Sequence, residues 1–194
     1  GTSIGSSNIS IMDIISIILH KVFNANLLEG IEAKDVAIIW SIRLPRVLLA
    51  FTVGGALAAS GAVVQSVLKN PLASPYTLGV SSGASLGVGL LVVSGISIPF
   101  LGNFSLPLVG FISSLLTMII VLVFASKVDK ELSNSTIILS GMVFSLFFNA
   151  ALTTITALFT NKIEAITMWQ MGSFSMRGWS YLKAGIPFFL IGII

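Results

Sequence analysis

Cysteine is absent from the 194-residue chain, and histidine occurs once. Without cysteine the chain has no disulfide framework, no thiolate metal site and no cysteine nucleophile. A single histidine argues against a histidine-based zinc site and against a Ser-His-Asp triad. The sequence therefore lacks the residue sets of the common metal-assisted and nucleophilic enzymes.

Charge is also scarce in this chain. Asp, Glu, Lys and Arg make up 9% of the residues, against about 25% in an average soluble domain. The hydrophobic share is 55% and the mean hydropathy is +1.04, which excludes a disordered chain because disorder needs low hydrophobicity. The net charge of +3 is spread thinly, so there is no basic patch for nucleic acid. The remaining class is an integral membrane protein.

The uncharged stretches predict where the membrane helices lie. No charged residue occurs for 22 residues after Arg46, for 57 after Lys69, or for 30 after Glu131. A hydrocarbon core of about 30 Å needs about 20 apolar residues in a helix. Residues 118–124 are apolar without interruption, whereas a barrel strand would alternate. The sequence therefore predicts an all-α, polytopic transmembrane helical bundle.

Four complete spans are predicted, at residues 47–68, 77–95, 106–125 and 136–159. A fifth begins near residue 181 and reaches residue 194, which is too short to cross a bilayer. We therefore expect this chain to be a fragment of a longer protein, with its bundle at 47–194.

Residues 1–46 are expected to form an outer-face segment that contains an amphipathic helix. Between Ile9 and Phe23, helical spacing gathers a polar stripe of Asp13, Ser16, His20 and Asn24. The opposite side is apolar and consists of Ile11, Ile14, Ile15, Ile18, Leu19 and Val22. This pattern is typical of a helix at the membrane surface. No basic region precedes it in this sequence, so we do not expect a signal peptide here.

Small residues recur at helical spacing in the predicted spans. The positions expected to pack against other helices are Gly54, Ala58, Gly61, Gly79, Gly83 and Gly87. Helices in lipid associate by close packing, and small residues let their backbones approach. A structural interface is favoured over a direct role in ligand binding.

The last complete span carries a polar stripe formed by Ser145, Asn149, Thr153, Thr156 and Thr160. Gln65 is a second polar side chain inside a span. Such groups either bond between helices or line a path for solute, and the sequence favours neither. Since none of the four complete spans contains a charged residue, a proton relay is not expected.

Two loops carry recognisable features. Arg43 and Arg46 stand three residues apart before the first span, where they could anchor the interface or bind carboxylates; the spacing alone favours anchors. Lys69 to Pro75 contains two prolines that end a helix, which alone indicates an ordinary turn.

Several motifs in order resemble one family closely. They are RLPR at 43–46, Ser60-Gly61 with Gln65, Asn70-Pro-Leu-Ala, LGVSSGA at 78–84, Leu139-Ser-Gly141, and the segment from Trp169 to Trp179. Together they resemble the first half of the permease subunit of the ABC importers for ferric siderophores, haem and vitamin B12. The resemblance covers nearly the whole chain, which we interpret as one truncated permease domain in a bacterial cytoplasmic membrane.

The resemblance implies partners and sites. Such permeases have about ten membrane helices and work as homodimers or heterodimers, driven by two cytoplasmic ATPases and loaded by a periplasmic or lipoprotein solute-binding protein. Arg43 and Arg46 would dock that protein through its acidic residues. Asn70, Pro71 and Leu72 would form a cytoplasmic gate. The path would be lined by Ser145, Asn149, Thr153 and Thr156. The resemblance implies that the family's first helix and its ATPase-coupling segment lie outside this sequence, so we expect no transport by this piece alone.

The orientation implied by the family conflicts with the charge count. Seven basic residues fall on the side of residues 1–46 and three on the other, so counting would place the first side in the cytoplasm. The family orientation places it outside. We prefer the family orientation, because arginines kept for docking would bias the count.

The chain is expected to be a transport subunit and not an enzyme. No phosphate-binding loop is present, since no lysine precedes Ser or Thr; ATP would be used by the partner ATPase. We expect no directly bound cofactor and no metal site. The alternatives are half of a channel or secondary transporter, or a structural membrane module. The sequence does not identify the chelate.

Overall fold

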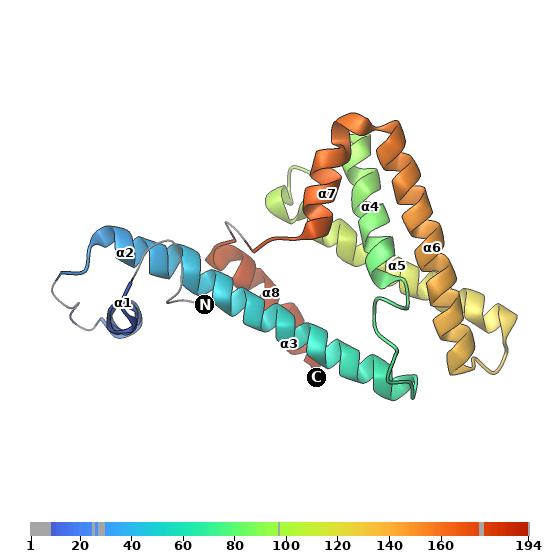
Figure 1. Ribbon diagram of the computed structural model, residues 1–194, viewed down its shortest axis with the longest axis horizontal. Helices are drawn as coiled ribbons and strands as arrows, with labels where there is room; N and C mark the ends of the chain where they lie inside the picture. Colours follow the sequence, from blue (N-terminus) through green and yellow to red (C-terminus); the bar gives the residue numbers. More distant parts are fainter. Residues whose placement is uncertain (1–8, 25, 27–29, 97, 175–176, 194) are drawn as a thin grey trace. The chain divides into compact units, whose positions relative to one another are not determined.

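The computed structural model describes residues 9–24, 26, 30–96, 98–174 and 177–193, and within these ranges the secondary structure is helical, without strands. Figure 1 shows the order of the helices along the chain. The chain divides into two compact units, residues 1–59 with 173–194, and residues 60–172. The boundary lies inside helix α3, and each unit is described separately. The prediction of an all-α helical protein is confirmed.

The first unit opens with α1 (Ile11–Phe23), which begins at a capping box. The Ser10 hydroxyl accepts a hydrogen bond from the amide of Met12, and the Asp13 carboxylate accepts one from the amide of Ser10. Ile14 and Ile17 are buried against Ile39. Several apolar side chains of α1 remain exposed: Ile11, Met12, Ile15, Leu19, Val22 and Phe23.

The amphipathic surface role of α1 stays a prediction. Ile11 and Ile15 on its apolar side are exposed, as a side that faces a membrane would be, whereas Ser16, assigned to the polar stripe, is buried. The packed side of α1 follows its contact with residues 38–43, which the spacing of polar residues did not indicate.

A long helical stretch follows and contains α2 (Ala33–Ala37), the π-helical segment η1 (Ile38–Arg43) and α3 (Leu44–Val67). Together they form one apolar helix of 35 residues, Ala33–Val67, which is long enough to cross a membrane. The helix thus begins well before the predicted span at 47–68. Helix α8 (Trp179–Ile193) completes the first unit, with the ring of Phe189 next to Gly55.

The second unit is built around α4 (Val80–Ser94). It contacts α5 (Ser105–Val128), α6 (Asn134–Leu158) and α7 (Ile163–Met171), as Figure 1 shows. Short 3-10 segments, Gly102–Phe104 and Thr160–Lys162, precede α5 and α7. One core cluster joins the turn after α3 to α6 and contains Leu68, Ala73, Leu78 and Ile138.

Glycines set the close approach of these helices. A Cβ at Gly83 would overlap the Thr117 side chain, and one at Gly87 would overlap Ser113, so α4 and α5 meet where two of the expected small residues lie. A Cβ at Gly54 or Gly61 would meet no atom within 4 Å in the described chain. Packing through Gly54, Ala58 and Gly61 stays a prediction.

Three helices of the described chain are long and apolar enough to span a membrane: Ala33–Val67, Ser105–Val128 and Asn134–Leu158. The last two coincide closely with the predicted spans at 106–125 and 136–159. The span predicted at 77–95 is too wide, because α4 has 15 residues. Gly79 and Gly95 have φ values of 80° and 67° and bound the helix at both ends.

The loop between α5 and α6 is held by one carboxylate. Asp129 accepts hydrogen bonds from the amides of Glu131 (3.0 Å) and Ser133 (2.9 Å) and from the Thr136 hydroxyl (3.1 Å). Hydrogen bonds from the Ser133 side chain and from the Ser133 and Glu131 amides lower the pKa of Asp129 to about 2. Ser133 in turn caps α6.

Candidate functional site

The two arginines assigned to docking lie at the junction between the π-helical segment and α3. Arg43 is the last residue of η1 and is half-buried, whereas Arg46 lies in the first turn of α3 and is exposed. Pro45 between them is buried. The amide of Leu44 bonds to the carbonyl of Ile39, five residues back, which is the π-helical pattern. The structure therefore places both arginines at a local irregularity of the helix.

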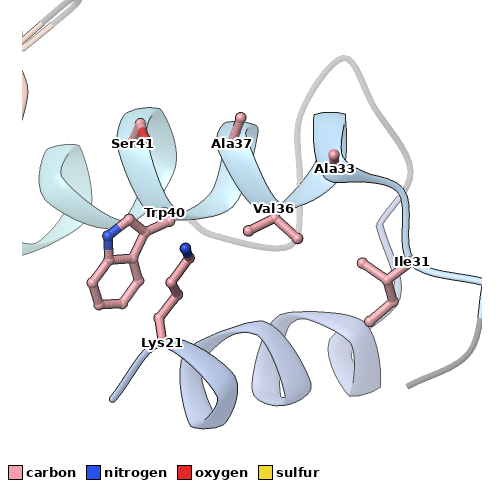
Figure 2. Close-up of a pocket in the computed structure, with 7 residues that line it drawn as sticks. All are labelled: Lys21, Ile31, Ala33, Val36, Ala37, Trp40 and Ser41. Carbon is pink, nitrogen blue, oxygen red and sulfur yellow. The ribbon is translucent and has the colours of Figure 1, made fainter. Parts of the chain in front are cut away.

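A groove of about 520 Å³ lies beside the same helical stretch (Figure 2). It is lined by Lys21, Ile31, Ala33, Val36, Ala37, Trp40 and Ser41. Figure 2 shows the Lys21 side chain of α1 extending toward Trp40. No sequence pattern paired these two residues, since they belong to different helices.

Trp40 also meets the first residue of α8. The indole nitrogen Nε1 of Trp179 donates a hydrogen bond of 2.8 Å to the carbonyl of Trp40, and the ring centroids are 4.9 Å apart. Sequence reasoning used Trp179 only as part of a family motif and gave it no structural role.

The turn after α3 is fixed by hydrogen bonds around Asn70. Helix α3 ends in a Schellman motif, with Lys69 at φ 45° and the Asn70 amide bonded to the carbonyl of Gln65 (3.1 Å). The Asn70 side-chain oxygen then accepts from the amide of Leu72 (2.9 Å). Ala73 is buried below, while Leu72 is 83% exposed. The turn presents an apolar side chain on an ordered backbone, with Pro71 exposed beside it.

A second set of bonds continues this turn toward α4. Ser74 and Thr77 bond reciprocally, amide to hydroxyl, at 3.0 and 3.3 Å. The chain then passes close to α6, because a Cβ at Gly141 would lie 2.6 Å from the Thr77 carbonyl oxygen and from the Leu78 Cα. The gate candidate and the polar helix are therefore joined within the second unit.

The polar stripe of α6 bonds largely to its own helix. The hydroxyls of Ser145, Thr153 and Thr156 donate to the carbonyls of Gly141, Asn149 and Thr153 at 2.8–2.9 Å. Asn149 is exposed on the same helix. In the described part of α6, these donors are thus used within the helix, and the interhelical interpretation gains no support from them. Thr160 lies beyond α6, in η3.

Among the described residues, no group of three or more His, Asp or Glu side chains could hold a metal ion.

Comparison with known proteins gives the family. The profile of the FecCD transport family matches residues 1–194. The chain belongs to this family. The relationship proposed from the RLPR, Asn-Pro-Leu-Ala and LGVSSGA motifs is confirmed.

Curated relatives of this FecCD-family chain are permeases. It is 43% identical over 194 residues to the ABC transporter permease YvrB of Bacillus subtilis. This alignment covers all of this chain and 55% of YvrB. It is 37% identical over 155 residues to the vitamin B12 import permease BtuC of Klebsiella pneumoniae (79% of this chain, 45% of that one). The hemin transport permease HmuU of Yersinia pestis is 36% identical over 163 residues (80% and 48%).

The solved structures include a matching fold. A metal-chelate type ABC transporter in an inward-facing conformation superposes with a TM-score of 0.70 at 29% identity, covering 93% of this chain and 57% of that one. The chain spans about half the length of the curated relatives it matches.

Proposed function

We propose that this chain is part of the membrane-spanning permease of an ABC importer for a metal chelate. The observation that carries the proposal is the family match over all 194 residues, with relatives named for vitamin B12, hemin and iron(III)-citrate transport. The chelate class is therefore a ferric siderophore, haem or a cobalamin. A separate ATPase would supply the energy, and a second permease copy would complete the path.

The arginine pair is the proposed docking site for a solute-binding protein. Arg46 is exposed and Arg43 half-buried at one helix junction, so both guanidinium groups belong to one short segment. Arginine binds carboxylates in a bidentate manner, which suits acidic residues on a partner. This arrangement fits docking, and the preference for docking over simple anchoring at the interface rests on the family match.

The turn at Asn70, Pro71 and Leu72 is the proposed cytoplasmic gate. A gate needs a side chain that blocks the path and a backbone that holds it in place. Leu72 is exposed on a turn fixed by the Asn70 side chain, which meets both needs. The chain that continues from this turn lies against Gly141 of α6 at Thr77 and Leu78, so a shift of α6 would act on the segment next to the gate.

The helix surface around Asn149 is the proposed wall of the path. Hydroxyls that already donate to their own helix leave only lone pairs for a solute. A wall of this kind binds weakly and would release a large chelate easily, which leaves selectivity to the delivery protein.

Orientation can be tested with a reporter fusion at Val128, at the exposed end of α5. We place this loop in the cytoplasm, so a fluorescent protein inserted after Val128 in the complete permease should fluoresce. Alkaline phosphatase at the same site should be inactive, because it needs the oxidising exterior. An active phosphatase with a dark fluorescent fusion would reverse the orientation.

The function itself is tested by uptake into proteoliposomes. The complete permease, its ATPase and its binding protein are reconstituted and offered labelled ferric siderophore, hemin and cobalamin in turn. We expect one of the three chelates to accumulate, and we expect this accumulation to require both ATP and the binding protein.

Two outcomes would contradict the proposal. Accumulation driven by an ion gradient without ATP would indicate half of a secondary transporter. No accumulation of any chelate by an assembled complex that hydrolyses ATP would favour a structural module.

A further inference from the structure

The backbone carbonyl of Trp40 lacks the helical donor that its position requires. In η1 the amide of Leu44 bonds to Ile39, five residues back, and not to Trp40. In the same pattern the donor to Trp40 would be the amide of residue 45. That residue is proline, which has no N–H. Backbone carbonyls that are shielded from water are nearly always paired, so we expect another donor to the carbonyl of half-buried Trp40.

The same proline accounts for the π-helical segment. In an α-helix the ring of Pro45 would clash with the carbonyl four residues back, at Ser41. A turn with one additional residue moves that carbonyl away, and such single π turns are a known response of helices to local strain. The widened turn thus accommodates the proline but shifts the missing bond to Trp40.

Trp179 supplies the donor. Its Nε1 lies 2.8 Å from the Trp40 oxygen, although the two residues are 139 positions apart in the chain. The centroids of the two rings lie 4.9 Å apart with an interplanar angle of 41°. The indole of Trp179 therefore contacts the ring of Trp40 as well as its backbone carbonyl. Both residues are half-buried, which shields the bond from competition with water.

We propose that Trp179 is a positioning residue for the docking arginines. Its indole N–H replaces the amide that Pro45 lacks and keeps residues 38–43 in the π-helical register. Arg43 ends this segment and Arg46 lies in the α-helix that follows, so the register decides how the two guanidinium groups stand relative to each other. The inference deepens the proposed docking function and rests on it.

The test uses the complete permease in nanodiscs with two tryptophan-to-phenylalanine variants. Trp179→Phe keeps an aromatic ring and removes the N–H. Trp169→Phe is the matched control, because its indole lies next to Gly110 in the second unit. Two quantities are measured, the amide hydrogen exchange of residues 38–46 and the Kd for the solute-binding protein.

We expect Trp179→Phe to speed exchange in residues 38–46 and to raise the Kd, each by about tenfold, since the loss leaves a carbonyl unpaired. Trp169→Phe should leave both within about twofold. Unchanged exchange in Trp179→Phe would overturn the inference. So would faster exchange with an unchanged Kd, in a protein whose docking does depend on the arginines.

A Pro45→Ala background separates the inference from a general packing defect. Alanine restores the amide at residue 45, so adding Trp179→Phe should then change the exchange of residues 38–46 by less than about twofold. An undiminished effect in this background would show that the indole acts by packing and would overturn the inference. If Arg43→Glu with Arg46→Glu does not change the Kd, the docking proposal fails instead, and the exchange results still report on the Trp179 bond.

Discussion

Replacing Arg43 and Arg46, the residues proposed for docking, by glutamate is expected to abolish delivery to the complete permease. Arg43→Glu with Arg46→Glu should raise the Kd for the solute-binding protein by at least about a hundredfold. Each substitution removes an attractive charge and places a like charge against the proposed acidic partner. Loss of one partner from a charge pair buried in an interface costs about 2–5 kcal/mol. Binding measured by surface plasmon resonance, and uptake in proteoliposomes, check this result.

A matched control is available on the same helical stretch. Lys34 is an exposed basic residue of α2, and Lys34→Glu should change the Kd by less than about threefold. The wild-type association rate should fall with added salt, because steering by charge is screened, and the arginine double variant should lose this dependence. If the double variant docks and transports like the wild type, the arginines are interface anchors and not a docking site.

Adding one methyl group at Gly141 is expected to destabilise the fold strongly. In Gly141→Ala the new Cβ would lie 2.6 Å from the Leu78 Cα and from the Thr77 carbonyl oxygen. These are backbone atoms of the segment that leads from the turn into α4, and they cannot rotate away as a side chain could. We expect a loss of about 3 kcal/mol, at the upper end of the usual range for overpacking. Thermal unfolding in detergent measures it.

Gly185→Ala serves as the control for this substitution. Gly185 lies inside α8, and a Cβ there would meet no atom within 4 Å in the described chain. Because alanine is a better helix former by up to about 1 kcal/mol, its melting temperature should stay the same or rise. Equal melting temperatures for Gly141→Ala and the wild type would contradict the close contact between α6 and the Thr77–Leu78 backbone.

The long helices could be read from the sequence, whereas their ends could not always be. The uncharged run after Lys69 correctly implied two helices. The earlier of these, α4, begins at Val80 and not at residue 77, since Ser74 and Thr77 bond to each other in a turn. The absence of charge does not register such bonds, because the turn is as free of charged residues as the helix.

In the candidate site, too, some features could be predicted from the sequence and others required the structure. Arg43, Arg46 and Asn70 were found by motif, and the structure adds the hydrogen bonds that hold the Asn70 turn. The role of Trp179 could not be found this way. Its partner is a backbone carbonyl in another helix. Every residue has such a carbonyl, so the sequence does not show which one the indole binds.

The sequence by itself determined the class of protein, its helical architecture and its family. About 20 uncharged apolar residues have one stable arrangement in a bilayer, a helix that satisfies its own backbone hydrogen bonds. The family was identifiable because its motifs occur in the sequence in a fixed order. Only the tertiary structure decided that Gly83 meets Thr117, that Gly141 meets the backbone near Leu78, and that Trp179 serves the carbonyl of Trp40. These contacts join residues far apart in the chain, and their energies depend on distances of a few ångströms that no local pattern encodes.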